Sequence, residues 1–274
     1  MRSCCTARGQ DRNADSSQNN IQKHHNCHCR GKISVVGIGP GSLSDMTDRA
    51  KQAIASADLI VGYDTYLALI KDLLTGKEIF SSGMMQEIDR CQAAVDAAAS
   101  GRQVAVISSG DPGVYGMAGL VLELANKIAQ DKRPDVEVIP GISAVGAAAA
   151  ILGAPLMHDF AVISLSDLLT PWELIKKRAA MAAEGDFVIA LYNPKSTKRV
   201  SQIEEVREIL LRHRPASTPV GIVHHATRKD ESVTLSNLQD FTKEYIDMFS
   251  LVIIGNSQTR IENGKMVTPR GYQV

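Results

Sequence analysis

Five segments of this sequence have the residue types of ligand-binding loops, and each follows a short apolar run typical of a β-strand. They span residues 36–41, 108–116, 140–144, 190–196 and 224–231. Glycine, which is frequent in the first three, allows the backbone to approach a bound molecule closely. Because ligands of open α/β sheets bind beyond the carboxyl ends of the strands, these segments predict a small-molecule site.

The first segment, 36–41, resembles the dinucleotide-binding pattern G-x-G-x-x-G but departs from it. The third glycine would fall at position 42, where Ser42 stands, and Pro40 lacks the N–H that a phosphate cradle uses. Asp58 lies at the distance along the chain expected for a ribose contact. An NAD site is therefore disfavoured. The segment is either a plain tight turn or a stiff surface on which an uncharged group rests.

The next two segments combine glycine with a possible capping residue. Three glycines and a proline accompany Asp111, whose carboxylate would accept hydrogen bonds from ribose hydroxyls or cap the following helix. Capping alone does not require so many glycines, which favours a ligand loop. Segment 140–144 resembles a nucleophile elbow, but Val145 occupies the position of its last glycine. Ser143 is therefore predicted to cap the following helix, with small neighbours that admit a ligand.

The last two segments contain basic residues. Lys195, Lys198 and Arg199 lie at the start of a predicted helix, where cations oppose the helix dipole. They are either a solvated face or partners for carboxylates of a ligand. His224 and His225 would face opposite sides of an extended segment and have no partner at helical spacing for a metal ion. We interpret them as hydrogen-bonded structural residues and assign no metal site.

Apolar periodicity places these segments between alternating strands and helices. Strands are predicted at 33–38, 58–61, 103–107, 136–139, 161–164, 187–191, 219–223 and 251–254, with two further short ones at 78–80 and 232–235. Helices are predicted at 45–57, 66–74, 86–99, 114–130, 143–152, 197–213 and 237–247, and one more begins with Thr170 as its N-cap. Such alternation predicts an α/β fold with mostly parallel sheets and helices on both faces.

The pattern restarts near residue 153, which predicts two α/β domains, 31–154 and 155–274, with a hinge at 152–158. A single continuous sheet is the alternative. Residues 1–30 are polar and contain four of the five cysteines together with a run of His and Cys. This segment is predicted to be a disordered tail rather than a metal site or a transit peptide.

Composition limits the class of function. Lys and Arg together number 30, as do Asp and Glu, so the net charge is zero, which argues against a general nucleic-acid binder. No apolar run is long enough to span a bilayer. Cys91 is the only cysteine outside the tail, which is typical of a reducing compartment, so a cytoplasmic protein is expected.

Taken together and in order, the loops resemble the tetrapyrrole methylase family. The pattern is V-G-x-G-P-G, G-D-P, P-G-I-S-A, Y-N-P and an A-T pair, and the resemblance extends over about residues 32–272. Segments 164–173 and 191–196 resemble the branch that acts on ring carbon C17 of precorrin-3B in cobalamin (vitamin B12) biosynthesis. The resemblance implies two α/β domains with the active site in the cleft between them, a homodimer, and S-adenosylmethionine as the methyl donor.

The resemblance also implies which residues contact the cofactor, largely through backbone atoms. These are Pro40, Ser109, Gly110, Asp111, Val114, Ser143, Ala144, Tyr192 and Ala226. The implied reaction is methylation of C17 of a tetrapyrrole (precorrin) substrate, coupled to ring contraction. Ring contraction requires proton transfer, for which Asp167, His158 and Asp111 are candidates. The carboxylates of the substrate would pair with Lys195, Lys198, Arg199 and Arg228.

Three alternatives stay open at this point. A sibling methylase would act on another ring carbon. An NAD-dependent oxidoreductase would use Gly37, Gly39 and Asp58, and a non-catalytic tetrapyrrole-binding protein would keep the loops without turnover. The sequence also leaves open whether the substrate carries cobalt.

Overall fold

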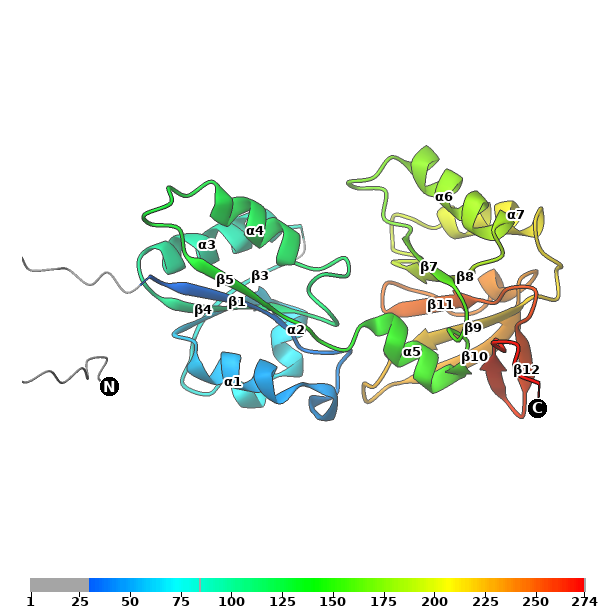
Figure 1. The fold of residues 1–274 in the computed structure, drawn as a ribbon, viewed down its shortest axis with the longest axis horizontal. Helices are drawn as coiled ribbons and strands as arrows, with labels where there is room; N and C mark the ends of the chain where they lie inside the picture. The colour runs from blue at the N-terminus through cyan, green and yellow to red at the C-terminus, as the bar shows by residue number, and fades with distance from the viewer. Residues whose placement is uncertain (1–29, 84, 274) are drawn as a thin grey trace, which may run out of the picture.

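The computed structural model describes residues 30–83 and 85–273, which form two α/β units that lie side by side along the long axis of the molecule (Figure 1). The predicted tail with its cysteines and histidines falls, apart from Arg30, outside the described residues. None of the helices in the described residues is long and apolar enough to cross a membrane.

The first unit is built on a parallel five-stranded sheet, as the alternating pattern predicts. Its strands are β1 (Lys32–Gly37), β2 (Leu59–Tyr63), β3 (Glu78–Ser82), β4 (Gln103–Ser108) and β5 (Asp135–Ile139). The order across the sheet is β3-β2-β4-β1-β5, and every neighbouring pair is parallel. The carboxyl ends of β1, β4 and β5 therefore lie next to one another.

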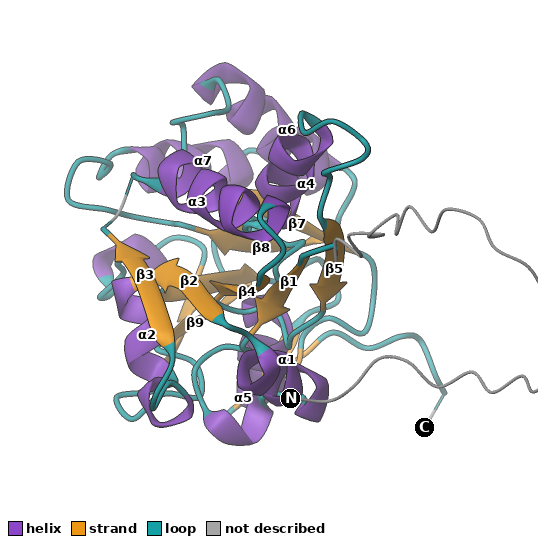
Figure 2. Ribbon diagram, turned by 90° about the vertical axis from the view of Figure 1, so that its left-hand side faces the viewer, coloured by secondary structure: helices purple, strands orange, loops and turns teal. Residues whose placement is uncertain are grey.

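Helices cover both faces of this sheet (Figure 2). One face is covered by α1 (Asp48–Ser56), α2 (Asp64–Leu69) and the short 3-10 turns η1 (Leu43–Asp45) and η2 (Lys71–Leu73). The other face is covered by α3 (Glu87–Ala99) and α4 (Ala118–Asn126). Successive strand residues point to opposite faces. Thus Val35 packs in the cluster under α3 and α4, whereas Val36 packs in the cluster under α1.

The second unit also has a five-stranded sheet, but the prediction that this sheet is mostly parallel is wrong. Its strands are β7 (Phe160–Ser164), β8 (Val188–Tyr192), β9 (Pro219–His224), β10 (Ser232–Asn237) and β11 (Ser250–Ile254), in the order β10-β9-β11-β8-β7. Only β7 and β8 are parallel, and the other three pairs are antiparallel. The connection between β9 and β10 is too short for a parallel crossover, which needs a dozen or more residues.

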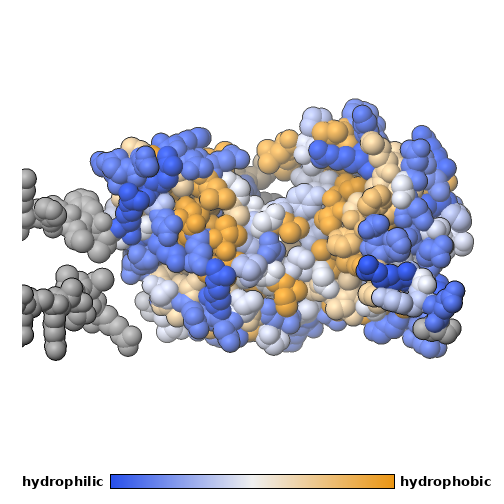
Figure 3. Space-filling view, viewed as in Figure 1, coloured by the Kyte–Doolittle hydropathy of each residue, from blue (hydrophilic) through white to orange (hydrophobic). Residues whose placement is uncertain are grey.

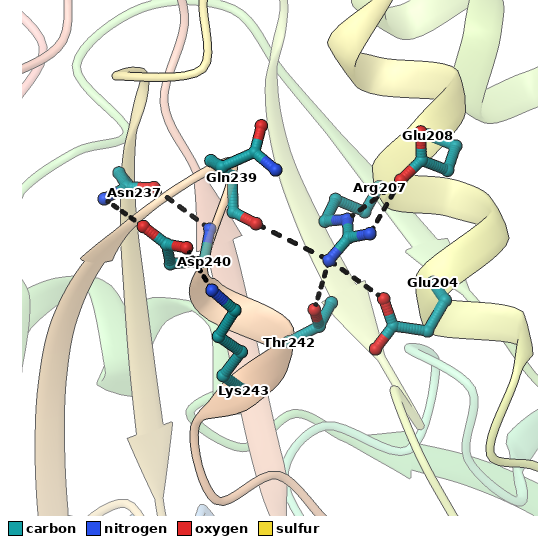
Figure 4. A network of polar contacts seen from close by, with 8 residues as sticks. All are labelled: Glu204, Arg207, Glu208, Asn237, Gln239, Asp240, Thr242 and Lys243. Atoms are coloured by element: carbon teal, nitrogen blue, oxygen red, sulfur yellow. Dashed lines mark hydrogen bonds and ion pairs between the residues drawn. The ribbon is translucent and has the colours of Figure 1, made fainter.

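The helix predicted at 237–247 is also wrong, because only the short 3-10 turn η3 (Phe241–Lys243) forms there. Long-range contacts determine this conformation. Arg207 on α7 (Gln202–Leu211) donates to the Thr242 hydroxyl at 2.9 Å and pairs with Glu204 and Glu208 on its own helix (Figure 4). The Thr170 cap is wrong as well, since α6 (Trp172–Glu184) has extended Pro171 at its N-cap and no side-chain capping bond.

The helix α5 (Ala144–Leu152) joins the two units and packs on the second sheet. Its buried face lies in one cluster with Val188, Val223 and Ile253 of that sheet. It leads into a small sheet of β6 (Gly153–Ala154), β12 (Arg260–Glu262) and β13 (Lys265–Val267). We therefore propose that the division between the units falls at residues 140–143, before α5, rather than at 154.

Candidate functional site

Three glycines bring the ends of β1, β4 and β5 into close contact. A methyl group on Gly37 would lie 2.6 Å from the Gly141 nitrogen and 2.8 Å from the Gly110 oxygen, and one on Gly141 would overlap the Gly110 oxygen. Gly39 and Gly110 also exchange two backbone hydrogen bonds, of 2.7 and 3.2 Å. Gly110 itself has φ +64°, a conformation that side chains other than glycine rarely adopt. Only glycine satisfies these contacts.

Asp111 clamps two of these loops together. Its Oδ1 accepts the Gly113 N–H at 2.8 Å, and its Oδ2 accepts the Gly141 N–H at 3.1 Å. Both oxygens are thus already engaged by the backbone. This arrangement makes Asp111 a support of the loop structure and leaves it poorly placed to exchange protons.

The second unit supplies the opposite wall from the ends of β8 and β9 and from the beginning of β11. Because β11 is antiparallel to both neighbours, Ser250 at its start is paired with His224 at the end of β9. The Tyr192 hydroxyl, at the end of β8, accepts the Val145 N–H of α5 at 2.9 Å. The segment before β11 therefore reaches the same place as the predicted loops.

These walls line a cavity of about 190 Å³ that opens to solvent. Figure 3 shows the surface hollowed between the two units, with apolar side chains beside the hollow on the second unit. The lining residues are Pro40, Tyr63, Tyr66, Ser109, Gly110, Asp111, Val114, Tyr115, Ala144, Tyr192, Asn193, Val223, His225, Ala226, Arg228, Met248, Phe249, Ser250 and Leu251.

All of the residues predicted to contact a cofactor line this cavity except Ser143. Ser143 is the N-cap of α5, where its hydroxyl accepts the Gly146 N–H at 3.4 Å. Its neighbour Ala144 provides the contact from that loop. The structure thus brings together residues that are separated by up to about 190 positions along the chain, from Pro40 to Ala226.

Two of the three predicted proton-transfer residues, Asp167 and His158, do not line the cavity. His158 is half exposed in the connection from β6 to β7, 3.7 Å from Asp159. Asp167 is exposed and accepts a hydrogen bond from Gln202 at 3.1 Å. It belongs to the connection from β7 to α6, which extends toward the first unit and carries the exposed Leu168 and Leu169 (Figure 1).

Of the four predicted carboxylate partners, only Arg228 lines the cavity. Arg199 is buried and donates to the Asn193 carbonyl at 2.7 Å, so it holds the turn after β8. Lys195 and Lys198 lie outside the lining. The Arg228 Nε donates to the Pro40 carbonyl at 3.0 Å, across the two units, and its guanidinium lies 5.6 Å from the Phe249 ring centroid.

Two further contacts join the units at the cavity. The Ser42 N–H donates to the Thr227 hydroxyl at 3.2 Å. The Tyr115 hydroxyl donates to the Val162 carbonyl at 3.0 Å and accepts the Ser164 N–H at 3.1 Å, and so occupies the free edge of β7. The cavity is therefore closed on several sides by direct contacts between the loops.

Backbone strain is concentrated at this site. Tyr115, Asn193, His225 and Thr227 have φ values of +53°, +48°, +52° and +60°. Such conformations cost non-glycine residues on the order of 1–3 kcal/mol each and persist where surrounding contacts enforce them, often at functional sites. Two of these residues, His225 and Thr227, lie in the turn after β9, which indicates that this turn has a role at the site beyond connecting two strands.

Several lining residues were missed by the sequence analysis. Tyr63, Tyr66, Met248 and Phe249 belong to no recognisable motif, and the place of the last two depends on the antiparallel direction of β11. His225 was noticed but interpreted as structural. The adjacent histidines were the available signal, and their position at the end of a strand supported a role at the site.

Burial changes the acid–base properties of the cavity. It raises the pKa of Tyr66, Tyr115 and Tyr192, so these hydroxyls stay protonated near neutral pH. Burial and the neighbouring His224 and Arg228 lower the pKa of His225, which keeps this imidazole neutral. Burial also lowers the pKa of Arg228, although it remains a cation.

Comparison with known proteins places the chain among methylases. A family model described as "Tetrapyrrole (Corrin/Porphyrin) Methylases" matches residues 32–242. The "Cobalt-factor III methyltransferase" of Priestia megaterium is 53% identical over 246 residues, which are 89% of this chain but only 46% of that protein, so the chain spans about half its length.

Two further relatives are matched over their whole length. The "Probable cobalt-factor III C(17)-methyltransferase" of Salmonella typhimurium is 52% identical over 240 residues, 88% of this chain and 99% of that protein. The crystal structure of the methyltransferase CobJ superposes with a TM-score of 0.83 at 38% identity, covering 87% of this chain and all of that one. The second unit, with its antiparallel strands, is thus part of a fold that known methyltransferases share.

The contact of the three glycines predicts a specific effect of Gly141→Ala. The added methyl group would overlap the Gly110 oxygen and lie 2.8 Å from the Gly37 carbonyl carbon, so the loops must separate. We expect the free energy of unfolding in urea to fall by about 1–3 kcal/mol, as in overpacked cores. The matched control is Gly119→Ala in α4, whose methyl group meets nothing within 4 Å and should be neutral or stabilising. Equal stability of both variants would contradict the close contact.

Proposed function

Because the chain belongs to the tetrapyrrole methylase family, we propose that it transfers a methyl group from S-adenosylmethionine to ring carbon C17 of precorrin-3B or its cobalt-containing counterpart, with contraction of the macrocycle, in cobalamin biosynthesis. The observation that carries this proposal is the cavity between the two units. It is lined by the same loops whose order along the chain resembles this family.

The loops suit a nucleoside with a sulfonium group. Gly110 and its neighbours offer backbone at close range, and the small side chains of Ala144 and Ala226, which also line the cavity, leave space for a flat base. The cofactor supplies a methyl group that is already activated as a leaving group on sulfur. The chain's task is therefore to hold the acceptor carbon in line with that methyl group and to exclude water.

Arg228 is the residue best placed to bind a carboxylate of the macrocycle. Its Nε is occupied by the Pro40 carbonyl, but neither terminal nitrogen hydrogen-bonds another described residue, and neither is enclosed. A guanidinium with two free nitrogens suits bidentate pairing with a carboxylate. Lys195 and Lys198 lie outside the lining, so they would pair only with substrate carboxylates that extend beyond the cavity. Arg199 donates to the Asn193 carbonyl instead.

We propose that the protein acts in the cytoplasm as a homodimer. Large apolar side chains are exposed on one region of the first unit, at Ile79, Phe80, Met85 and Ile88, as is typical of a surface that another protein covers. The one cysteine in the part of the chain that the structure describes, Cys91, is buried and free, which is consistent with a reducing compartment.

The alternatives of the sequence analysis differ in how well they suit the cavity. An NAD-dependent oxidoreductase would need a phosphate cradle at the end of β1, where Pro40 supplies no N–H and its carbonyl is taken by Arg228. A sibling methylase acting on another carbon would have the same cofactor loops. The identity of the acceptor carbon is therefore the point that experiment has to decide.

The direct test is incubation of the purified protein with S-adenosylmethionine and either cobalt-factor III or precorrin-3B. We expect a product heavier by one methyl group, with the label of a ¹³C-methyl donor on C17 by NMR. The cobalt-containing substrate is the first choice, because both methyltransferase relatives above bear its name. Methylation of a different ring carbon would support a sibling methylase, and binding of NAD without S-adenosylmethionine would contradict the proposal.

Replacement of Gly110 by valine should abolish cofactor binding. A β-branched residue at φ +64° is strained and would push the loop into the cavity. Calorimetry with S-adenosylmethionine should show a loss of affinity of at least about 100-fold, or 2.7 kcal/mol. Gly76→Val is the matched control, because Gly76 has φ +74° but lies in an open turn outside the lining. Unchanged affinity in Gly110→Val would refute the role of this loop.

Replacement of Arg228 by glutamine should weaken substrate binding more than cofactor binding. The loss of a charge-assisted pair with a carboxylate costs about 1.5–3 kcal/mol, which corresponds to a rise in KM for the macrocycle of about 10- to 100-fold. The neighbouring exposed Lys229 provides the control variant Lys229→Gln, whose KM should stay within about twofold of the wild type. Equal KM values for the two variants would exclude Arg228 as a carboxylate partner.

A further inference from the structure

His225 lies in the wall of the cavity in a strained conformation that the fold alone does not explain. We propose that His225 is a catalytic residue, which accepts the proton that the macrocycle loses when it is methylated. This inference rests on the proposed function and assigns to one residue the proton transfer for which Asp167, His158 and Asp111 are the candidates in the sequence.

The charge balance of the reaction requires such a group. Cleavage of the bond between sulfur and methyl leaves a neutral thioether, and the new carbon–carbon bond places one positive charge on the macrocycle. A neutral product forms when one N–H or O–H bond of the macrocycle breaks, its electron pair stays on the macrocycle, and the proton moves to a base. On His225 this proton yields an imidazolium, which later releases it to solvent.

Five of the other titratable groups of the cavity are poorly suited to this step. Both oxygens of Asp111 are held by backbone N–H groups. The hydroxyls of Tyr115 and Tyr192 are hydrogen-bonded to backbone atoms. Tyr66 stays protonated near neutral pH because it is buried, and Arg228 has no proton to lose and no lone pair to accept one.

Contacts around His225 fix its ring at the cavity. Its ring centroid lies 3.9 Å from that of His224 and 5.1 Å from that of Phe249. The Nδ1 atom is enclosed without a hydrogen bond, 3.6 Å from the Asp230 carboxylate. The Nε2 atom is not enclosed and has no hydrogen-bonding partner among residues 30–83 and 85–273, so it is the nitrogen that a substrate can reach.

His224 supports this arrangement from the other side. Its Nε2 lies 3.2 Å from the Asp247 carboxylate, which also accepts the Tyr245 hydroxyl and the Phe249 N–H. Burial alone would raise the pKa of Asp247, but hydrogen bonds from the Phe249 N–H, His224 and the Ser250 hydroxyl hold it below the usual range. The ionised Asp247 therefore orients His224, on which the His225 ring rests.

The charged groups facing His225 come from three elements. His224 lies at the end of β9, Arg228 and Asp230 in the turn that follows, and Asp247 before β11. Burial is the largest influence and lowers the pKa of His225. His224 and Arg228 lower it further, and the two carboxylates act in the opposite direction. An imidazole kept neutral at physiological pH is in the correct state to accept a proton.

The test is the variant His225→Asn, because asparagine tolerates positive φ better than other residues with a side chain and so preserves the strained turn. We expect kcat for methyl transfer to fall by at least about 100-fold, the usual contribution of a general base. The affinity for S-adenosylmethionine, measured by calorimetry, should stay within about threefold of the wild type. The loss of activity of the wild type at acidic pH should disappear in the variant.

A second variant and a control separate catalysis from folding. His225→Gly also accepts the backbone conformation and leaves space in which added imidazole should restore part of the activity. His213→Asn, at an exposed histidine after α7, should keep wild-type rates. A His225→Asn enzyme with wild-type kcat, or with an unchanged acid limb, would overturn the role of His225 alone. A wild-type protein that binds the cofactor but methylates neither macrocycle would overturn the proposed function itself.

Discussion

The site depends on the contact of three peptide backbones where β1, β4 and β5 end. Neighbouring strands of a sheet lie about 4.8 Å apart, and the loops that leave them converge further because Gly37, Gly110 and Gly141 have no side chains in the way. Asp111 then joins two of the loops through both of its oxygens. Of the three glycines, Gly110 lines the cavity, so this part of the wall is a surface of backbone atoms whose shape does not depend on rotamers. Such a surface suits a ligand that is recognised mainly through main-chain contacts.

The sequence predicts the features that depend on local residue types and does not predict those that depend on contacts between distant segments. Glycine and proline act locally, so the loops and most of the cavity lining could be found from their types and spacing. The direction of a strand is not a local property, because a buried strand has the same apolar pattern whether its neighbour is parallel or antiparallel. The positions of Met248 and Phe249 could not be predicted for this reason. The same holds for segment 237–247, whose conformation depends on Arg207, about 30 residues away.

The proton-transfer residues show a second limit. Residue type suggests two carboxylates and the imidazole of His158, but type does not reveal which lone pairs are already used. Asp111 reaches the cavity with both oxygens occupied, and Asp167 is held by Gln202 outside the lining. His225, in contrast, has a ring nitrogen without a hydrogen-bonding partner that a substrate can reach, and its backbone has φ +52°. Positive φ at a residue other than glycine leaves no trace in a single sequence, so this feature required the structure.

The electrostatics of the cavity are consistent with this division of roles. The proposed sulfonium cofactor would bring one positive charge, and Arg228 provides another that is partly buried. A third cation nearby would be costly in a site of reduced dielectric. The same burial and the same arginine lower the pKa of His225 and keep it neutral until a proton arrives. After methyl transfer the cofactor has lost its charge, so the imidazolium that forms takes the place of the sulfonium rather than adding to it. The number of positive charges in the cavity then stays constant through the reaction, which favours proton transfer to this partly buried histidine.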